Sequence, residues 1–260
     1  MNLEALLLVR MNRVGVITLN RPKKLNALNE MLLRELNQVL NELKADKSIR
    51  SIIITGSGEK AFAAGADLEE IATKNPFDLW QFLRQGQETF RTIETLGKPV
   101  IGAINGMALG GGAELALACT LRIASENASF SFPESGLGGL PGYGGTQRLP
   151  KLIGQTMALE YLLTGDAING QIAETLRLVN KVVPQADLME TSLKLAKKLT
   201  NKAPASVEMV LNAVAGSMEI PAVWGSLLEV SLASICSSTN DSKEGIAAIQ
   251  EKRRPVFNGN

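Results

Sequence analysis

The chain has 260 residues, of which 45% are hydrophobic and 20% charged, a composition typical of folded globular proteins rather than disordered or fibrous ones. Its 27 Lys and Arg residues and 26 Asp and Glu residues leave a formal net charge of +1, so no overall field attracts nucleic acid or an anionic membrane. Histidine is absent, which excludes Ser-His-Asp and Cys-His catalysis and histidine-based zinc sites, and two cysteines are too few for a cysteine-only zinc site.

Predicted strands and helices alternate over the first two-thirds of the chain. The first ten residues carry no basic segment before their apolar run, so they are interpreted as a strand rather than a signal peptide. Strands are predicted over residues 6–10, 14–19, 51–55, 99–104, 121–124 and 129–132. Asn29 is expected to cap a helix with a stripe of leucines, and further helices are predicted over residues 76–96 and 113–119.

The last third is predicted to be nearly all helical. Helices are expected over residues 157–163, 171–176, 188–199, 204–214, 221–235 and 242–252. This order indicates an α/β fold with a helical C-terminal region, and a boundary near Gly154 or Gly165 fits the pattern. No apolar run approaches the roughly 20 residues that a membrane-spanning helix needs. Cys119 and Cys236 lie in apolar stretches and are interpreted as buried thiols, which fits a cytoplasmic, reducing compartment.

Glycine-rich segments resemble nucleotide-binding loops but depart from them. The run from Gly136 to Gly142 nearly matches G-x-G-x-x-G, yet Pro141 stands where the third glycine belongs. The run from Gly106 to Gly112 lacks the Lys-Ser/Thr ending of a phosphate-binding loop. No G-x-S-x-G sequence occurs. These departures disfavour dinucleotide-dependent enzymes, nucleoside triphosphatases and serine hydrolases.

Two glutamates are candidate catalytic groups. Glu114 lies in the first turn of an apolar helix after three glycines, where by itself it would merely complement the helix dipole. Glu134 follows Pro133 in a loop after a strand, where by itself it would be a solvated residue or a helix cap. If the two meet, burial and mutual repulsion keep one carboxyl protonated and one charged. Such a pair can hold a water molecule between one acid and one base.

Two backbone amides are candidates for stabilising a negatively charged oxygen. The first N–H groups of a helix lack internal partners, which applies to Gly111 at the start of the helix that carries Glu114. The small residues before Asp67 leave a second amide accessible, that of Ala66, while Asp67 itself is expected to cap a helix beginning at Leu68. Two such amides would form an oxyanion hole for a carbonyl or thioester substrate.

Basic residues admit two interpretations. The clusters at Lys23-Lys24 and Lys252-Arg253-Arg254 are either solvated surface or a site for the phosphates of a large carrier. Arg148 is interpreted as a structural ion-pair partner rather than a ligand.

Four motifs in order carry a family resemblance. They are Asn20-Arg21-Pro22-x-x-Leu25-Asn26-Ala27-Leu28, Ala61-Phe62-Ala63-Ala64-Gly65-Ala66-Asp67, Asn105-Gly106-x-Ala108-Leu109-Gly110-Gly111-Gly112-x-Glu114 and Pro133-Glu134-x-x-Leu137-Gly138-x-x-Pro141-Gly142-x-Gly144-Gly145-Thr146-Gln147-Arg148-Leu149. Over nearly its whole length the chain resembles the crotonase superfamily, and most of all its enoyl-CoA hydratases. The resemblance implies a core of repeated ββα units over residues 1–195. It also implies a helical trimerisation region over residues 196–260, with trimers that commonly pair into hexamers.

The resemblance also implies roles for particular residues. The N–H groups of Ala66 and Gly111 are expected to bind the thioester oxygen, and Glu114 and Glu134 to hold the reacting water. Coenzyme A and the acyl group are expected to contact Lys24, Leu25, Ala27, Ala64, Ala66, Asp67, Leu68, Gly110, Pro133, Leu137 and Gly142. Coenzyme A arrives with the substrate, so neither a metal nor a separate cofactor is expected, and no nucleic acid or membrane partner is expected.

Retention of both glutamates favours a hydratase, a lyase that adds water reversibly to trans-2-enoyl-CoA. One alternative is a Δ3-Δ2-enoyl-CoA isomerase, in which a carboxylate moves a proton and no water adds. Another is a non-catalytic RNA-binding homologue, which the balanced charge disfavours. The chain departs from the pattern at Glu69, where some hydratases carry Lys, and at Arg177, where many members have Gly. Acyl chain length and metabolic pathway stay open.

Overall fold

A six-stranded sheet forms the larger layer of the fold. The computed structural model describes residues 3–217 and 219–259. Within them the sheet has the order β1-β2-β3-β5-β7-β10, with β1 and β2 antiparallel and the other neighbouring pairs parallel. Its strands are β1 (Leu6–Met11), β2 (Val14–Leu19), β3 (Ser51–Gly56), β5 (Val100–Ile104), β7 (Leu121–Ser125) and β10 (Lys181–Val183). The Ile-rich strand β3 is buried along its whole length, as expected for a parallel strand covered on both faces.

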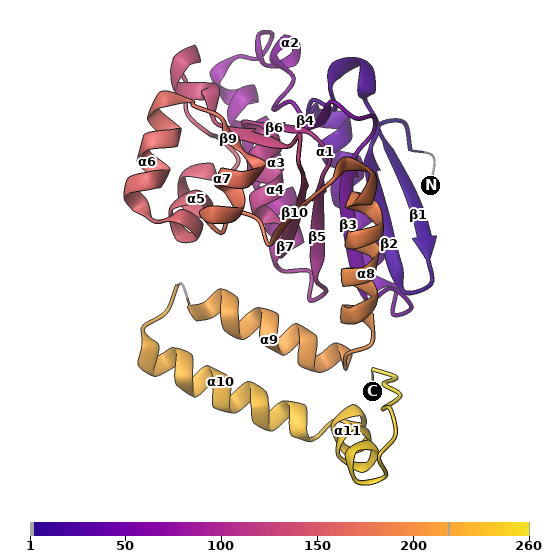
Figure 1. Cartoon of the computed structure of the whole chain (residues 1–260). Helices are drawn as coiled ribbons and strands as arrows, with labels where there is room; N and C mark the ends of the chain where they lie inside the picture. The colour runs from indigo at the N-terminus through magenta and orange to yellow at the C-terminus, as the bar shows by residue number, and fades with distance from the viewer. Residues whose placement is uncertain (1–2, 218, 260) are drawn as a thin grey trace.

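The fold contains a second, smaller sheet. Its order is β4-β6-β8-β9, formed by β4 (Ala61–Ala63), β6 (Met107–Leu109), β8 (Ser129–Ser131) and β9 (Ile168–Asn169). Each of β4, β6 and β8 comes directly after a long strand and leads into helical structure, so the ββα unit repeats along the chain (Figure 1). The predicted α/β fold with repeated ββα units is therefore confirmed.

Helices cover one face of the larger sheet and surround the smaller one (Figure 1). Helix α1 (Glu30–Ala45) begins where predicted, because the Asn29 side chain accepts a hydrogen bond from Leu32 N at 3.0 Å. Its buried leucines pack in the main core, and the helix lies against α3 (Pro76–Glu94). The other helices here are α2 (Leu68–Ile71), α4 (Gly111–Ala118), α5 (Gly145–Ile153), α6 (Gln155–Thr164), α7 (Gly170–Thr175) and the 3₁₀ turns η1 (Pro22–Lys24), η2 (Pro133–Leu137) and η3 (Gln185–Asp187).

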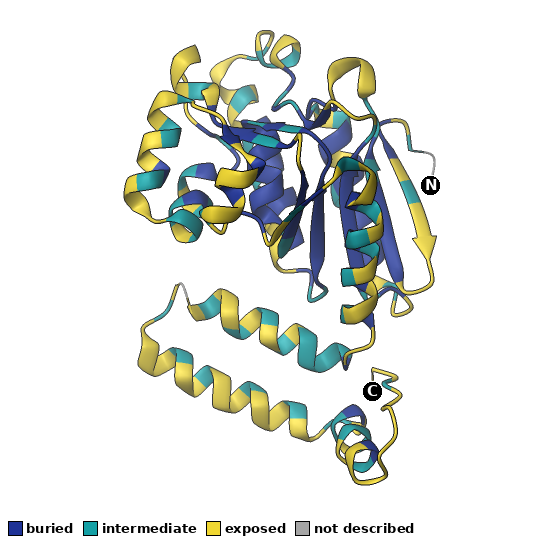
Figure 2. Cartoon of the chain, in the orientation of Figure 1, coloured by how far each residue is buried: buried dark blue, intermediate teal, exposed yellow. Residues whose placement is uncertain are grey.

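Helix α8 (Leu188–Thr200) covers the other face of the larger sheet. It closes a second apolar cluster with Ile53, Ile101 and Ile123. Ala196 and Thr200 are still buried, so the division placed after residue 195 falls inside this helix. Below α8, Figure 2 shows mostly exposed and partly buried residues, with a few buried ones in the last helix.

Three C-terminal helices extend beyond the body of the molecule (Figures 1 and 2). They are α9 (Pro204–Ser217), α10 (Ala222–Ser237) and α11 (Asn240–Gln250). Helices α9 and α10 pack on each other, yet neither has a fully buried residue among those described. None of the helices described in residues 3–217 and 219–259 combines the length and apolar character that crossing a membrane requires.

The elements absent from the sequence prediction are short or contain residues that disfavour them. Helix α5 starts at Gly145 and contains Pro150, both poor helix formers, and it went unpredicted. The region after Gln155 is nearly all helical as expected, apart from the unpredicted short strands β9 and β10. Strand β10 has three residues and gains its place by pairing with β7. Cys119 is buried as expected, whereas Cys236 is only partly buried.

Candidate active site

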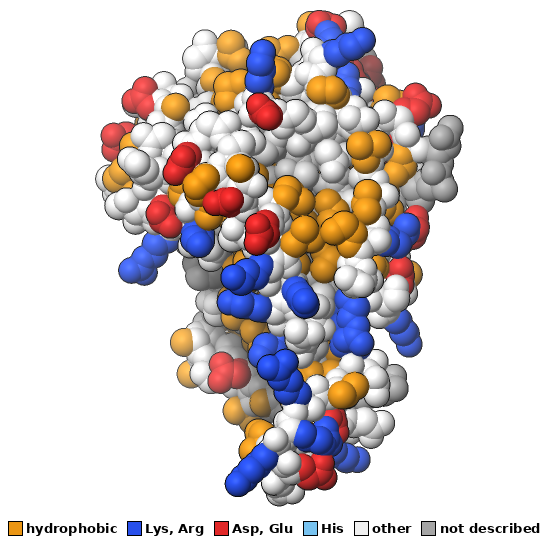
Figure 3. All heavy atoms as spheres, turned by 45° about the vertical axis from the view of Figure 1, so that its right-hand side comes forward, with side chains coloured by type: hydrophobic (Ala, Val, Ile, Leu, Met, Phe, Trp, Pro, Cys, Tyr) orange, Lys and Arg blue, Asp and Glu red, His pale blue; other side chains and the backbone are white. Residues whose placement is uncertain are grey.

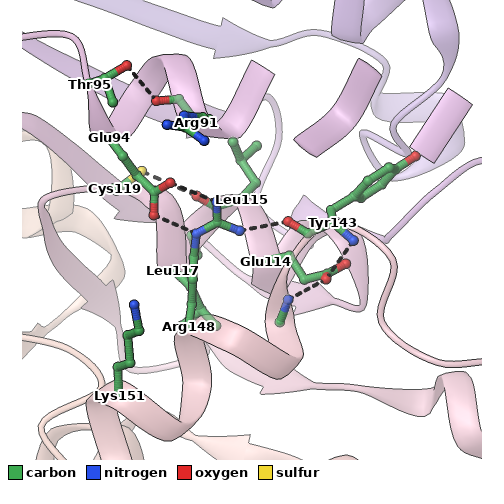
Figure 4. Close-up of polar contacts among 12 residues, drawn as sticks. Arg91, Glu94, Thr95, Glu114, Leu115, Leu117, Cys119, Tyr143, Arg148 and Lys151 are labelled. Carbon is green, nitrogen blue, oxygen red and sulfur yellow. Dashed lines mark hydrogen bonds and ion pairs between the residues drawn. The ribbon is translucent and has the colours of Figure 1, made fainter. Parts of the chain in front are cut away.

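Glu114 lies in the first turn of α4 with its side chain almost wholly buried, at 1% exposure. Its Oε1 accepts hydrogen bonds from the backbone N–H groups of Tyr143, at 2.8 Å, and Gly145, at 2.6 Å (Figure 4). Tyr143 belongs to the turn that connects η2 to α5, and Gly145 is the first residue of α5. The carboxyl group is therefore held in one orientation by a segment about thirty residues later in the chain.

Opposing effects set the acidity of Glu114. Burial is the largest of them and raises the pKa, because a charged carboxylate loses its hydration. The hydrogen bond from Gly145 lowers the pKa, the charge of Glu134 raises it, and the Tyr143 amide and the Arg148 charge lower it. The result is a pKa of about 7, which suits a group that takes up and releases protons near neutrality.

Glu134 reaches the start of the same helix from η2. A Cβ atom placed on Gly110 would lie 2.5 Å from Glu134 Oε1, so a larger residue there would displace this carboxyl group. Gly110 also has a φ of +45°, a conformation that glycine adopts without strain. Burial raises the pKa of Glu134, and its buried Oε2 has no hydrogen-bond partner among the described residues. Glu134 therefore lies against the residue that precedes α4, and Glu114 lies in the first turn of the same helix.

The amides of Ala66 and Gly111 lie in neighbouring segments. Leu28 N donates to Gly65 O at 2.7 Å and Asp67 N donates to Leu28 O at 2.9 Å, so the N–H of Ala66, between them, points away from Leu28. A Cβ atom on Gly65 would lie 3.9 Å from Gly111 N, which places the two segments side by side. Within residues 3–217 and 219–259, neither amide has a hydrogen-bond acceptor.

Close packing of Gly112 against β4 keeps the segments that carry the two amides together. A Cβ atom on Gly112 would lie well under 3.0 Å from the carbonyl oxygen of Ala63, so α4 starts in contact with β4. Larger residues at this position would push the two amides apart.

The predicted coenzyme A contacts lie on the side of Ala66. Ala64 N donates to Leu25 O at 3.0 Å, which joins η1 to the connection between β4 and α2. Lys24 is paired with Glu69, at the position where the chain departs from the family pattern. Ala27 is buried, whereas Leu68 is exposed.

Asp67 is the N-cap residue of α2, which begins at Leu68 as expected, but the expected side-chain cap is not formed. Its side chain makes no hydrogen bond to the amides of α2 and instead forms an ion pair with Arg21 at 2.9 Å. Arg21 belongs to the first motif, so the pair ties that motif to the second.

The remaining predicted substrate contacts surround the two glutamates. Gly110 lies against Glu134, and Pro133 immediately precedes Glu134 in η2. Leu137 is largely exposed at the end of η2. A Cβ atom on Gly142 would lie 2.6 Å from Leu83 of α3, so this glycine lets the turn approach that helix.

Arg148 forms the ion pair that the sequence predicted. Its guanidinium donates to both carboxylate oxygens of Glu94, at 2.6 and 2.8 Å, and to the carbonyl oxygen of Tyr143 at 2.7 Å (Figure 4). The pair connects α3 and α5 to the turn whose amides hold Glu114. The sequence did not indicate Tyr143 and Gly145 as donors, because nearly every residue has a backbone amide and residue type does not show where that amide points.

Basic side chains gather elsewhere on the surface, over the lower half of the face in Figure 3. Two cavities of about 380 and 350 Å³ have basic residues in their walls and share Arg13 and Asn201. Neither cavity contains Glu114 or Glu134. Among the residues that the structure describes, no three acidic or cysteine side chains are grouped as metal ligands.

Comparisons with known proteins agree on one family. The family model described as Enoyl-CoA hydratase/isomerase matches residues 10–260. The chain is 42% identical over 254 residues to a short-chain-enoyl-CoA hydratase of Clostridium acetobutylicum, covering 98% of this chain and 97% of the relative. It is 41% identical over 254 residues to a crotonyl-CoA hydratase of Syntrophomonas wolfei, covering 98% of each. A crystal structure of enoyl-CoA hydratase from Bacillus anthracis matches with a TM-score of 0.96 at 39% identity, over 99% of this chain and 100% of that one.

Proposed function

Because the chain belongs to the enoyl-CoA hydratase/isomerase family, we propose that it adds water reversibly to trans-2-enoyl-CoA, giving 3-hydroxyacyl-CoA. The observation that carries this proposal is the meeting of two carboxyl groups and two unpartnered amides at the start of α4. Full-length similarity to proteins named as enoyl-CoA hydratases supports the same reaction.

The amides of Ala66 and Gly111 bind the thioester oxygen in this proposal. They withdraw electron density from the conjugated system, so the β-carbon becomes electrophilic. As water adds, negative charge moves onto the thioester oxygen, and fixed donors stabilise it without reorganising. The helix dipole of α4 adds positive potential at Gly111.

The two glutamates divide the proton transfers. Two amides fix Oε1 of Glu114 and favour its charged form, so this carboxylate orients the water and accepts its proton as the oxygen bonds to the β-carbon. Burial raises the pKa of both carboxyl groups, so one of them can hold a proton near neutrality. We assign this proton to Glu134, whose Oε2 has no hydrogen-bond partner among the described residues, and Glu134 delivers it to the α-carbon. The added groups are one hydroxyl and one proton, which together make up the water consumed.

Coenzyme A lies along the η1 side of the site, and no separate cofactor takes part. Lys24, Leu25, Ala27, Ala64, Asp67 and Leu68 supply its contacts in this arrangement. The chain assembles as a homotrimer or a homohexamer, which is supported by the exposed apolar side chains of α9 and α10. Free thiols at Cys119 and Cys236 fit a cytoplasmic location.

A crotonyl-CoA hydration assay tests the proposal. Wild type is expected to hydrate crotonyl-CoA, and Glu114→Gln and Glu134→Gln each to lower kcat by about 10²-fold or more. Near-wild-type turnover in either variant would contradict its assigned role. A 3-enoyl-CoA substrate separates the isomerase alternative, because an isomerase shifts that double bond while leaving crotonyl-CoA unhydrated.

A further inference from the structure

The ring of Tyr143 fills the space between α3 and α4. The side chain is 1% exposed. Cβ atoms placed on Gly86 of α3 and Gly111 of α4 would each lie under 3.0 Å from its ring carbons, so both glycines make room for it. Phe82 and Phe90 of α3 meet the ring edge-on, with centroid separations of 6.0 and 5.5 Å. The ring is therefore a fixed wall rather than a mobile side chain.

This wall stands next to the reacting atoms. Tyr143 N lies 2.8 Å from Glu114 Oε1, and the ring contacts Gly111, whose amide is a proposed oxyanion donor. Water held by Glu114 attacks the β-carbon, so that carbon lies within a few ångströms of Glu114. The next acyl carbons start from this point, beside the turn that carries Tyr143.

The direction of the acyl chain follows from the side on which coenzyme A is placed. The coenzyme A contacts proposed above lie toward Ala64 and Ala66, on the other side of the thioester. The acyl chain therefore leaves toward the turn and α3. There Leu83 packs against Gly142, and the Tyr143 ring occupies the space beyond.

We propose that Tyr143 closes the inner end of the acyl site and makes this chain selective for short enoyl groups such as crotonyl. The inference rests on the proposed hydratase function and names the substrate class of that same site. A longer acyl chain needs the volume between α3 and α4 that the ring fills.

The ring's bulk, not its hydroxyl, carries this selectivity. The Tyr143 hydroxyl is buried and has no hydrogen-bond partner among the described residues. Removing it leaves the wall in place, whereas removing the ring opens the space beside Gly86. Tyr143→Phe is thus the matched control for Tyr143→Ala. Both variants keep the backbone amide that Glu114 accepts.

The test compares kcat/KM for crotonyl-CoA with kcat/KM for trans-2-decenoyl-CoA. Wild type is expected to favour crotonyl-CoA at least about tenfold, and Tyr143→Ala to lower this ratio by about tenfold or more. Tyr143→Phe should keep the ratio within about twofold. Ile53→Ala, which removes buried volume against α8 on the other face of the sheet, should lower the melting temperature without changing the ratio.

Two results overturn the inference. One is a wild type that hydrates both substrates equally well, and the other is a folded Tyr143→Ala variant with the wild-type ratio. If Tyr143→Ala does not fold, Tyr143→Leu makes the same comparison with a smaller loss of volume. A wild type that hydrates neither substrate overturns the proposed function instead, which keeps the two failures distinct.

Discussion

Burial of the Glu114 carboxyl group suits it to proton transfer near neutrality and also makes its ionisation costly for the folded state. Burial raises its pKa to about 7 from an ordinary value of 4.5, despite two hydrogen bonds that favour the charged form. The folded state therefore holds this proton more tightly than the unfolded chain does. The protonated Glu114 side chain contributes fully to the free energy of unfolding below pH 4.5, and this contribution is lost as the pH rises toward 7.

Replacing Glu114 with Gln is expected to remove that pH dependence. Each pKa unit is worth about 1.4 kcal/mol, so the variant should gain about 3 kcal/mol relative to wild type between pH 4.5 and pH 8. Chemical unfolding of both proteins across this range measures the difference. Glu59→Gln, at an exposed position, controls for losing one negative charge. A difference that stays flat with pH would show that Glu114 ionises normally in the folded protein.

The turn between η2 and α5 is the element that positions Glu114. Arg148 holds the carbonyl oxygen of Tyr143 and is itself held by Glu94, so the turn's amides are aimed by an ion pair between two helices. The charge of Arg148 also lowers the pKa of Glu114. Arg148 is thus a positioning residue with an electrostatic effect.

These two effects can be separated by substitution. Arg148→Met should lower kcat about tenfold and move the acidic limb of the kcat/KM profile to higher pH, because the pKa of Glu114 rises when the positive charge is lost. Arg148→Lys keeps the charge but loses the two-pronged contact, so kcat should fall while the limb stays in place. An Arg148→Met profile with an unmoved limb would rule out the electrostatic effect.

Elements with strong local signals were predictable from the sequence. The Asn29 cap, the leucine stripe of α1 and the isoleucine run of β3 each indicate the element type from a few neighbouring residues. The glycines at the start of α4 and both glutamates could be selected as candidates because their motifs are compact, and the structure brings them close together. Their catalytic roles stay a prediction. Helix α5 was not found, since its glycine and proline disfavour a helix that tertiary contacts nevertheless stabilise.

Contacts between distant segments could not be predicted by residue type. Aspartate is a residue type that commonly caps helices. In the folded chain, however, the Asp67 side chain forms an ion pair with Arg21 rather than a capping hydrogen bond. The amides of Tyr143 and Gly145 and the place of the Tyr143 ring depend on how α3, α4 and the η2–α5 turn pack. These features decide the acidity of Glu114 and the length of the acyl site.

The whole molecule exposes an apolar surface on its C-terminal helices. On α10, Val223, Trp224, Leu227 and Val230 are between 56% and 75% exposed and recur at helical spacing. Helices α9 and α10 have too little buried surface to form a core of their own. This surface is consistent with the proposed assembly of several copies of the chain.

Charged substitutions on this surface are expected to break the assembly. Wild type should sediment at three or six times 27.8 kDa, and the double variant Trp224→Glu, Leu227→Glu at a smaller mass. Glu229→Gln, exposed on the same helix, should leave the mass unchanged. Sedimentation of wild type as a 27.8 kDa species would refute the assembly.

The most direct measurement is a double-mutant cycle on Glu114 and Glu134. Turnover of crotonyl-CoA is compared for wild type, Glu114→Gln, Glu134→Gln and the double variant. If both carboxyl groups act on one water molecule, either single change removes most of the catalysis. The double variant is then about as slow as the slower single one. Rate losses that multiply, or a single variant near the wild-type rate, would contradict a shared role for the pair.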